Sequence, residues 1–130
     1  MNRLVIQRLC IGALPLLVAA GCGSDDDSSS EDPALEEAVR AYSADFLAGD
    51  ATAAYANMSE RCHGILAEDV FATVVASAAD AFGDEEITDF DADVDGDEAT
   101  VSYEFSDETL NQADERWILE SGAWHIDDCQ

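Results

Sequence analysis

The spacing of the apolar residues along the chain changes once, near residue 83. Between residues 33 and 82 they recur every three or four positions, which is the period of an amphipathic α-helix. The first such face is formed by residues spaced by four, three and four: Leu35, Val39, Tyr42 and Phe46. Asp32 suits the N-terminal cap of this helix, and Gly49 suits its end. The pattern therefore predicts a first helix between these two residues.

Two further helices are predicted before residue 83. Asp50 can cap a short one, which includes Ala54 and Tyr55 on its apolar face. A longer one runs from about Leu66 to Phe82, and the glycine that follows it ends it. The residues between these two helices, Ser59 to Gly64, are predicted to form a loop.

After Gly83 the apolar period falls to two, which is typical of strands with one exposed face. Asp95-Gly96 is a signal for a tight hairpin. Four antiparallel strands are expected near residues 88–94, 99–105, 116–120 and 123–129, with a polar loop over 106–114. Helices followed by strands indicate an α+β fold, with three N-terminal helices packed against a sheet of about four strands. Residues 33–130 are long enough for one modest core and form a single predicted domain.

The first predicted strand contains a motif that also begins calcium-binding loops. Asp91, Asp93 and Asp95 with Gly96 match the opening of such a loop. The twelfth position, however, is Ser102, where a calcium loop needs a bidentate glutamate. The same aspartates fit the exposed face of a hairpin, so the sequence favours the hairpin, and no metal site is expected.

The N-terminal segment has the order of an export signal. Arg3 and Arg8 precede an apolar run from Leu9 to Ala20, and small residues follow up to Cys22. The apolar run has about 12 residues, whereas a permanent membrane-spanning helix needs roughly 20. A signal that is cleaved without lipid attachment is one reading of this segment.

Residues Leu14 to Cys22, which end in Ala-Ala-Gly-Cys, resemble the lipobox of bacterial lipoproteins. The resemblance implies that residues 1–21 are removed, that Cys22 is lipidated, and that the domain lies on the extracytoplasmic face of the cell membrane. Residues 22–32 are rich in Ser and Asp and are predicted to form a disordered acidic tether.

Charge restricts the partners of the protein. The sequence has 30 acidic residues against five arginines and no lysine, with a formal net charge of −25. Such a chain repels phosphate backbones, so nucleic acid is not expected as a partner. It also repels anionic lipid headgroups, so contact with the membrane would depend on the lipid anchor.

The cysteines are informative once the predicted processing is taken into account. Cys10 lies in the predicted signal and Cys22 is the predicted lipidation site, which leaves Cys62 and Cys129. In an exported protein such a pair is expected to form a disulfide. A metal or redox pair is the alternative, but the two residues are far apart and form no C-x-x-C motif.

The layout of the predicted domain resembles the nuclear transport factor 2-like superfamily, which includes ketosteroid isomerase-like proteins. The resemblance is carried by the segment from Tyr42 to Asp50, by Ala54 to Cys62, and by the closing hairpin Arg116 to Ile126. The predicted protein is also similar to exported lipoproteins of actinobacterial type. The resemblance implies a curved sheet that wraps the helices and leaves a conical pocket. Activities in this superfamily vary widely, so no reaction follows from the fold.

Two sets of residues are candidates for chemistry or binding. His125 and Asp127 are expected on one face of the last strand, where they are candidates for a base and its orienting partner; a surface histidine is the alternative. His63 is adjacent to Cys62, but the predicted disulfide disfavours a thiolate. Aromatic residues are candidates either to line an apolar pocket or to fill the core: Tyr42, Phe46, Tyr55, Phe71, Tyr103 and Trp117.

These observations favour a lipid-anchored envelope protein that binds a small apolar ligand or a protein partner and has no catalytic activity. No cofactor is expected. The alternative is an enzyme of the ketosteroid isomerase or dehydratase sort, with a histidine or a buried carboxylate as base. A carboxylate with a strongly raised pKa inside a pocket would favour the enzyme.

Overall fold

The computed structural model describes residues 32–130. The predicted signal peptide, the lipidation site Cys22 and all of the predicted tether except Asp32 lie outside the described residues. Among residues 32–130, no helix is both long and apolar enough to span a membrane.

The first half of the described chain forms four α-helices: α1 (Pro33–Ala48), α2 (Ala51–Ala56), α3 (Glu60–Ile65) and α4 (Glu68–Phe82). Asp32 caps α1, since its side chain accepts hydrogen bonds from the backbone N–H groups of Ala34 and Leu35. Gly49 ends α1 in the left-handed conformation, with φ of 83°, which a residue without a Cβ adopts without strain.

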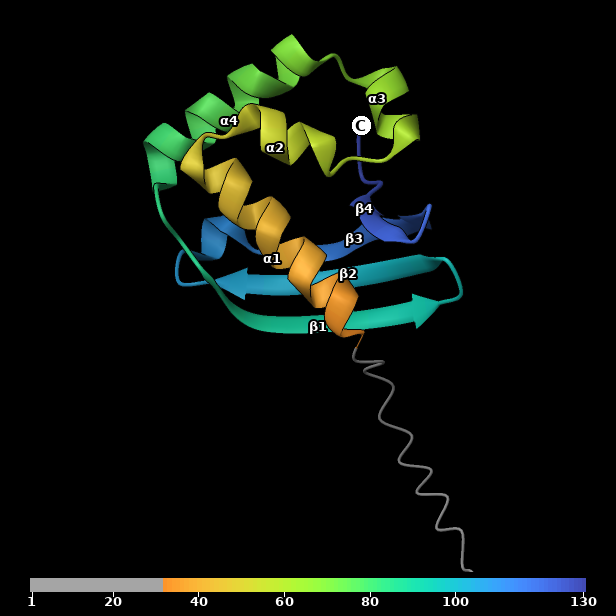
Figure 1. The fold of residues 1–130 in the computed structure, drawn as a ribbon. Helices are drawn as coiled ribbons and strands as arrows, with labels where there is room; N and C mark the ends of the chain where they lie inside the picture. The colour runs from red at the N-terminus through yellow and green to blue at the C-terminus, as the bar shows by residue number, and fades with distance from the viewer. Residues whose placement is uncertain (1–31) are drawn as a thin grey trace, which may run out of the picture.

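The second half forms one antiparallel sheet in the order β1-β2-β3-β4. Its strands are β1 (Ile87–Asp95), β2 (Glu98–Phe105), β3 (Gln112–Glu120) and β4 (Ala123–Ile126), with a 3₁₀ turn, η1 (Glu108–Leu110), before β3. In Figure 1, α1 lies across the sheet. β1 and β2 lie on one side of α1, and α2 and α4 lie on the opposite side. The predicted α+β class is therefore confirmed.

One helix was not predicted. Residues from Ser59 onward, expected to be a loop, form the short helix α3, so the domain has four α-helices and not three. The cause is local, because the hydroxyl of Ser59 caps the helix by accepting a hydrogen bond from the backbone N–H of Cys62 at 3.2 Å.

The strand boundaries also differ from the prediction. β3 starts at Gln112, inside the expected polar loop, because Gln112 pairs with Tyr103 after a register shift in the ladder. In β1 a shift near its start places Ile87 in the core and leaves Thr88 exposed. β4 ends at Ile126, and the next residue, Asp127, still donates its backbone N–H to Arg116 O of β3 at 2.8 Å.

The hydrophobic core lies between α1 and the inner face of the sheet. Alternate residues of β2 face it, as the period of two predicts. Trp117 is 1% exposed and packs edge-on against Tyr42, with ring centroids 6.0 Å apart. The acidic motif near Asp91 to Gly96 forms the predicted hairpin, in which β1 ends at Asp95 and β2 begins at Glu98.

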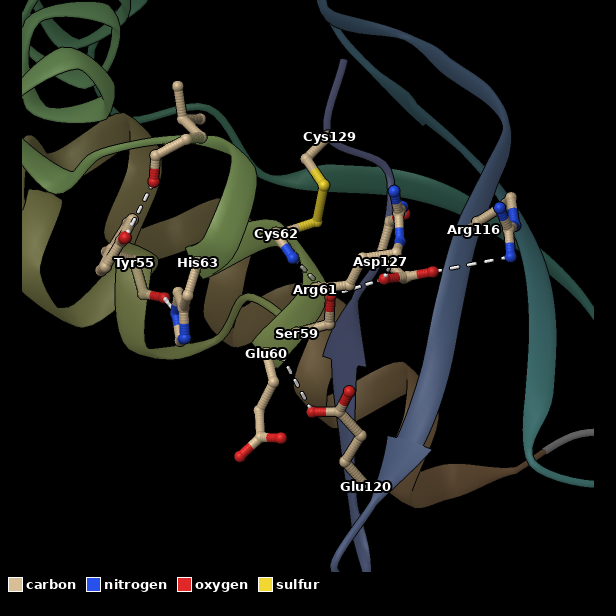
Figure 2. The surroundings of a disulfide bond; sticks show 11 residues. Tyr55, Ser59, Glu60, Arg61, Cys62, His63, Arg116, Glu120, Asp127 and Cys129 are labelled. Carbon is tan, nitrogen blue, oxygen red and sulfur yellow. Dashed lines mark hydrogen bonds and ion pairs between the residues drawn. A yellow bond between two sulfur atoms is a disulfide. The ribbon is translucent and has the colours of Figure 1, made fainter.

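The C-terminal residues are joined to α3. The structure brings Cys62 and Cys129 to disulfide distance, with sulfur atoms 2.05 Å apart and Cα atoms 5.5 Å apart, as the sequence predicts. Figure 2 shows this bond between α3 and the chain that follows β4. It closes a loop with a sequence separation of 67 residues, which contains all of α4 and the whole sheet.

Removal of this bond should lower the stability of the domain substantially. In the chain-entropy model, a loop of this length contributes about 4 kcal/mol, and the double variant Cys62→Ser/Cys129→Ser should lose roughly that amount. Urea unfolding measures the loss. A reductant should shift the midpoint of the wild type and leave that of the double variant unchanged. Equal stability of the two proteins without reductant would contradict the assignment.

Candidate functional site

A cavity of about 230 Å³ opens between the second half of α1, the inner face of the sheet and the residues after β4. Its wall is mainly apolar and aromatic, with a few polar groups. It is formed by Tyr42, Ser43, Phe46, Leu47, Tyr103, Phe105, Leu110, Gln112, Glu115, Ile126 and Asp128. Gln112 and Asp128 are exposed, which places them at its mouth.

A buried carboxylate forms part of the cavity wall. Glu115 is 7% exposed, because it occupies an inward position of β3 two residues before Trp117. The hydroxyl of Tyr103 donates to both carboxylate oxygens at 3.1 Å, and the indole Nε1 of Trp117 donates to Oε1 at 2.8 Å. These two donors fix the carboxylate in position.

Burial raises the pKa of Glu115 to about 7, because the charged form loses its hydration. The hydrogen bonds from Trp117 and Tyr103 act in the opposite direction, and the negative charge of Asp128 adds to the rise. Near neutral pH, Glu115 therefore changes between its charged and neutral forms.

Two tyrosine hydroxyls belong to the same wall. Burial raises the pKa of both Tyr42 and Tyr103, and the charge of Glu115 adds to each rise. Both phenols therefore keep their protons at neutral pH, and Tyr103 uses its proton in the bond to Glu115.

Ser43 supplies a hydroxyl that lacks a partner. Ser43 is 7% exposed, and its Oγ forms no hydrogen bond with any described residue. It lies near the phenol of Tyr103 and acts to lower the pKa of that group, against the rise that burial causes. An unpaired buried hydroxyl is unusual and indicates a position where a bound molecule would supply the missing bond.

His125 lies away from this cavity. It pairs with Ile118 in the sheet, and its side chain lines a surface hollow that also contains His63, Glu60 and Glu120. Its Nδ1 is buried and makes no hydrogen bond among the described residues. His63 donates from Nε2 to the backbone oxygen of Tyr55 at 2.7 Å.

Asp127 does not share a site with His125. Because β4 ends at Ile126, Asp127 turns toward α3, where its Oδ1 accepts bonds from Ser59 Oγ at 2.5 Å and Arg61 Nε at 3.0 Å (Figure 2). Arg116 lies on its other side, 3.5 Å from Oδ2. Burial acts to raise the pKa of Asp127, but these hydrogen bonds and charges outweigh it, and the pKa lies below its ordinary value. Asp127 is therefore paired with Ser59, Arg61 and Arg116, and it orients no histidine.

The six aromatic candidates divide into two groups. Tyr42, Phe46 and Tyr103 line the cavity. Three others lie outside its wall: Tyr55 donates its hydroxyl to Leu66 O at 2.8 Å, Phe71 packs against Phe46 and Tyr55, and Trp117 supports Glu115. Sequence reasoning missed Ser43 and Glu115, although the alternation of β3 with Trp117 inward would have placed Glu115 inward as well.

Within residues 32–130, no group of three or more His, Cys, Asp or Glu side chains is arranged to hold a metal ion. The polar side chains of the cavity are those of Glu115, Tyr42, Tyr103 and Ser43, together with Gln112 and Asp128 at its mouth.

No family model matches the chain, and no curated protein matches it. The chain is similar to a solved structure described as a "Putative NTF2-like transpeptidase" from Campylobacter jejuni, with 18% sequence identity and a TM-score of 0.49. The likeness covers 70% of this chain and 94% of that chain. A likeness at this level identifies no activity, and the α+β class stands on the helices and strands described above.

Burial of Glu115 should make the stability of the domain depend on pH. The folded pKa of about 7 lies above the ordinary value of 4.5, so the contribution of Glu115 is fully favourable below pH 4.5 and is lost as the pH rises through 7. Glu115→Gln can keep both bonds at the Oε1 position. It should exceed the wild type in stability at pH 8 by on the order of 3 kcal/mol, and the difference should vanish near pH 4.5.

Urea unfolding of both proteins between pH 4.5 and 8 measures this difference. Glu37→Gln, which removes an exposed carboxylate from α1, is the matched control and should follow the wild type. Parallel curves for Glu115→Gln and the wild type would show that Glu115 titrates normally in the folded protein.

Proposed function

We propose that this is a lipid-anchored, extracytoplasmic envelope protein that binds a small, mainly apolar ligand in the cavity and does not transform it. The observation that carries the proposal is the cavity itself, in which an aromatic and aliphatic wall surrounds a few polar groups. This combination is typical of small-molecule sites. At about 230 Å³ the cavity is below the usual range of roughly 300–1,000 Å³, so the ligand is smaller than a drug-sized molecule.

The Ser43 hydroxyl supports binding. A buried polar group without a partner costs about 1–3 kcal/mol, which a ligand that hydrogen-bonds to Ser43 Oγ would recover. Ser43 lies on the α1 wall, one residue after Tyr42. A ligand can therefore contact the apolar wall and satisfy this hydroxyl at the same time.

Two features favour binding over catalysis. The Tyr103 proton is already donated to Glu115, so this phenol is not free to stabilise a developing negative charge on a substrate. Neither of the two histidines of the chain lines the cavity. A reaction there would depend on Glu115 alone.

A second candidate function follows from Glu115. A carboxylate with a pKa of about 7 inside a cavity is suited to remove a proton near neutral pH, as in an enzyme of the ketosteroid isomerase or dehydratase sort. The raised pKa is the specific observation that favours this alternative. The enzyme hypothesis predicts one result that simple binding does not, namely a chemical change in the bound molecule that depends on Glu115.

Native mass spectrometry of the full chain, recovered from the envelope of its host, tests the cavity. The wild type should carry a small molecule, and Ser43→Phe, which fills the cavity, should lose it. Ala41→Phe adds the same ring to an exposed position of α1 and should retain the ligand. If Ser43→Phe fails to fold, Ser43→Val removes only the hydroxyl and should weaken ligand retention.

Each result discriminates. A wild type that carries no molecule would contradict cavity binding and favour a protein partner. A ligand that Ser43→Phe and Ala41→Phe retain equally would place binding elsewhere. Incubation with the wild type, but not with Glu115→Gln, could change the recovered molecule chemically. That result would favour the enzyme hypothesis over the binding hypothesis.

The proposed location is supported by the lipobox-like segment that ends at Gly21-Cys22 and by a disulfide, which is typical of oxidising compartments. Cys22→Ala should move the protein from the membrane fraction to the soluble fraction in its host, because the acidic surface supplies no attraction to anionic lipid. Cys10→Ala is the control and should stay with the membrane. Membrane retention of Cys22→Ala would rule out lipid anchoring at this residue.

A further inference from the structure

We infer that the ligand of this cavity is a cationic amine, that is, an ammonium group on a small apolar body, and that the cavity rejects carboxylates and phosphates. The inference rests on the proposed binding function and names the class of ligand. It follows from the charges that line the cavity and from those that are absent from its wall.

The charged groups of the wall are both carboxylates. Glu115 lies buried inside, and Asp128 lies at the mouth. Glu115 Oε2 accepts one hydrogen bond, from Tyr103, whereas Oε1 accepts two. A carboxylate oxygen has room for a further donor, and a charged N–H donor forms the stronger bond. The wall therefore offers an acceptor for an ammonium.

An anionic ligand would find no positive charge. The chain has no lysine, and none of its three arginines in the described domain lines the cavity. Arg40 is paired with Glu36 and with the backbone oxygen of Ile87, while Arg61 and Arg116 are paired with Asp127. An anion would lose its hydration beside two carboxylates with nothing in exchange, which is strongly unfavourable.

The rest of the wall fits the body of such an amine. Phe46, Leu47, Phe105 and Ile126 supply apolar surface. Ser43 Oγ, which has no partner among the described residues, can accept a second N–H of the same ammonium. The excess of 30 acidic residues over five arginines also raises the local concentration of cations around the domain.

Binding of an amine should depend on the ionisation of Glu115. The side chains that face Glu115 are Tyr42 from α1, Tyr103 from β2, Trp117 from β3 and Asp128 from the C-terminal residues. Of these, only Asp128 is a carboxylate. Since burial holds the pKa of Glu115 near 7, an ammonium should bind more tightly at pH 8 than at pH 6.

Three probes of the same size but different charge test the inference: benzylamine, benzyl alcohol and benzoate. Calorimetry with the full chain in detergent at pH 8 should show benzylamine binding at least tenfold more tightly than benzyl alcohol, with no binding of benzoate. Between pH 6 and 8 the affinity for benzylamine should rise roughly tenfold, while that for benzyl alcohol should not change.

Glu115→Gln should lose the preference for benzylamine and its pH dependence while it still binds benzyl alcohol. Glu37→Gln also removes one carboxylate, from an exposed position, and should behave as the wild type, which separates the cavity from general attraction to the acidic surface.

The possible failures are distinct. Equal affinity for benzylamine and benzyl alcohol in the wild type, or tighter binding of benzoate, would overturn the inference and leave the proposed binding function intact. A preference for benzylamine that survives Glu115→Gln would place the amine outside the cavity and also overturn it. A folded wild type that binds none of the probes would contradict both the inference and the proposed function.

Discussion

The carboxylate of Asp127 joins α3 and β3 to the segment that follows β4. It binds the cap residue and the first turn of α3 through Ser59 and Arg61, and it reaches β3 through Arg116. Its neighbours in sequence, Ile126 and Asp128, both contribute to the cavity wall. The adjacent disulfide at Cys129 fixes the same segment to α3 covalently. A charged cluster and a disulfide that both lie outside the cavity therefore hold the C-terminal side of its wall in place.

The cavity contains two features that folding alone does not favour. Glu115 is a buried carboxylate whose charged form is destabilised, and Ser43 Oγ is a buried hydroxyl without a partner among the described residues. An apolar residue at either position would remove the corresponding cost. Conflicts between local stability and sequence are expected at functional sites, and here both conflicts occur in one wall.

Regular patterns made most of the fold predictable, and local exceptions to them account for the rest. The helical period of α1, the alternation in β2 and the Asp95-Gly96 turn each identify their element directly. Helix α3 was missed because Cys62 is its only buried residue and its remaining residues show no apolar pattern, so that only the serine cap marks its start. The expected shared face of His125 and Asp127 failed because β4 stops after four residues, which a periodic pattern does not reveal.

The candidate site was harder to predict than the fold. Tyr42, Phe46 and Tyr103 could be identified from the sequence, because they are aromatic residues on predicted inner faces. Glu115 lies in a run of polar residues that resembles an exposed loop, so its position two residues before the inward Trp117 was not recognised as part of a strand. Tyr103, which donates to Glu115, lies on β2, and Ser43, which shares the cavity wall, lies on α1, so the site is assembled only by the packing of separate elements.

The acidic hairpin affects how copies of this protein would meet on a membrane surface. β1 is an outermost strand of the described sheet, and such strands invite pairing with a second copy of the same chain. Its aspartates at alternate positions, Asp89, Asp91, Asp93 and Asp95, would face their own counterparts in that pairing, and like charges directly opposite one another are repulsive. On the proposed lipid anchor, neighbouring molecules diffuse in two dimensions and meet often. The aspartates that match the start of a calcium loop would then keep anchored copies from pairing edge to edge and aggregating.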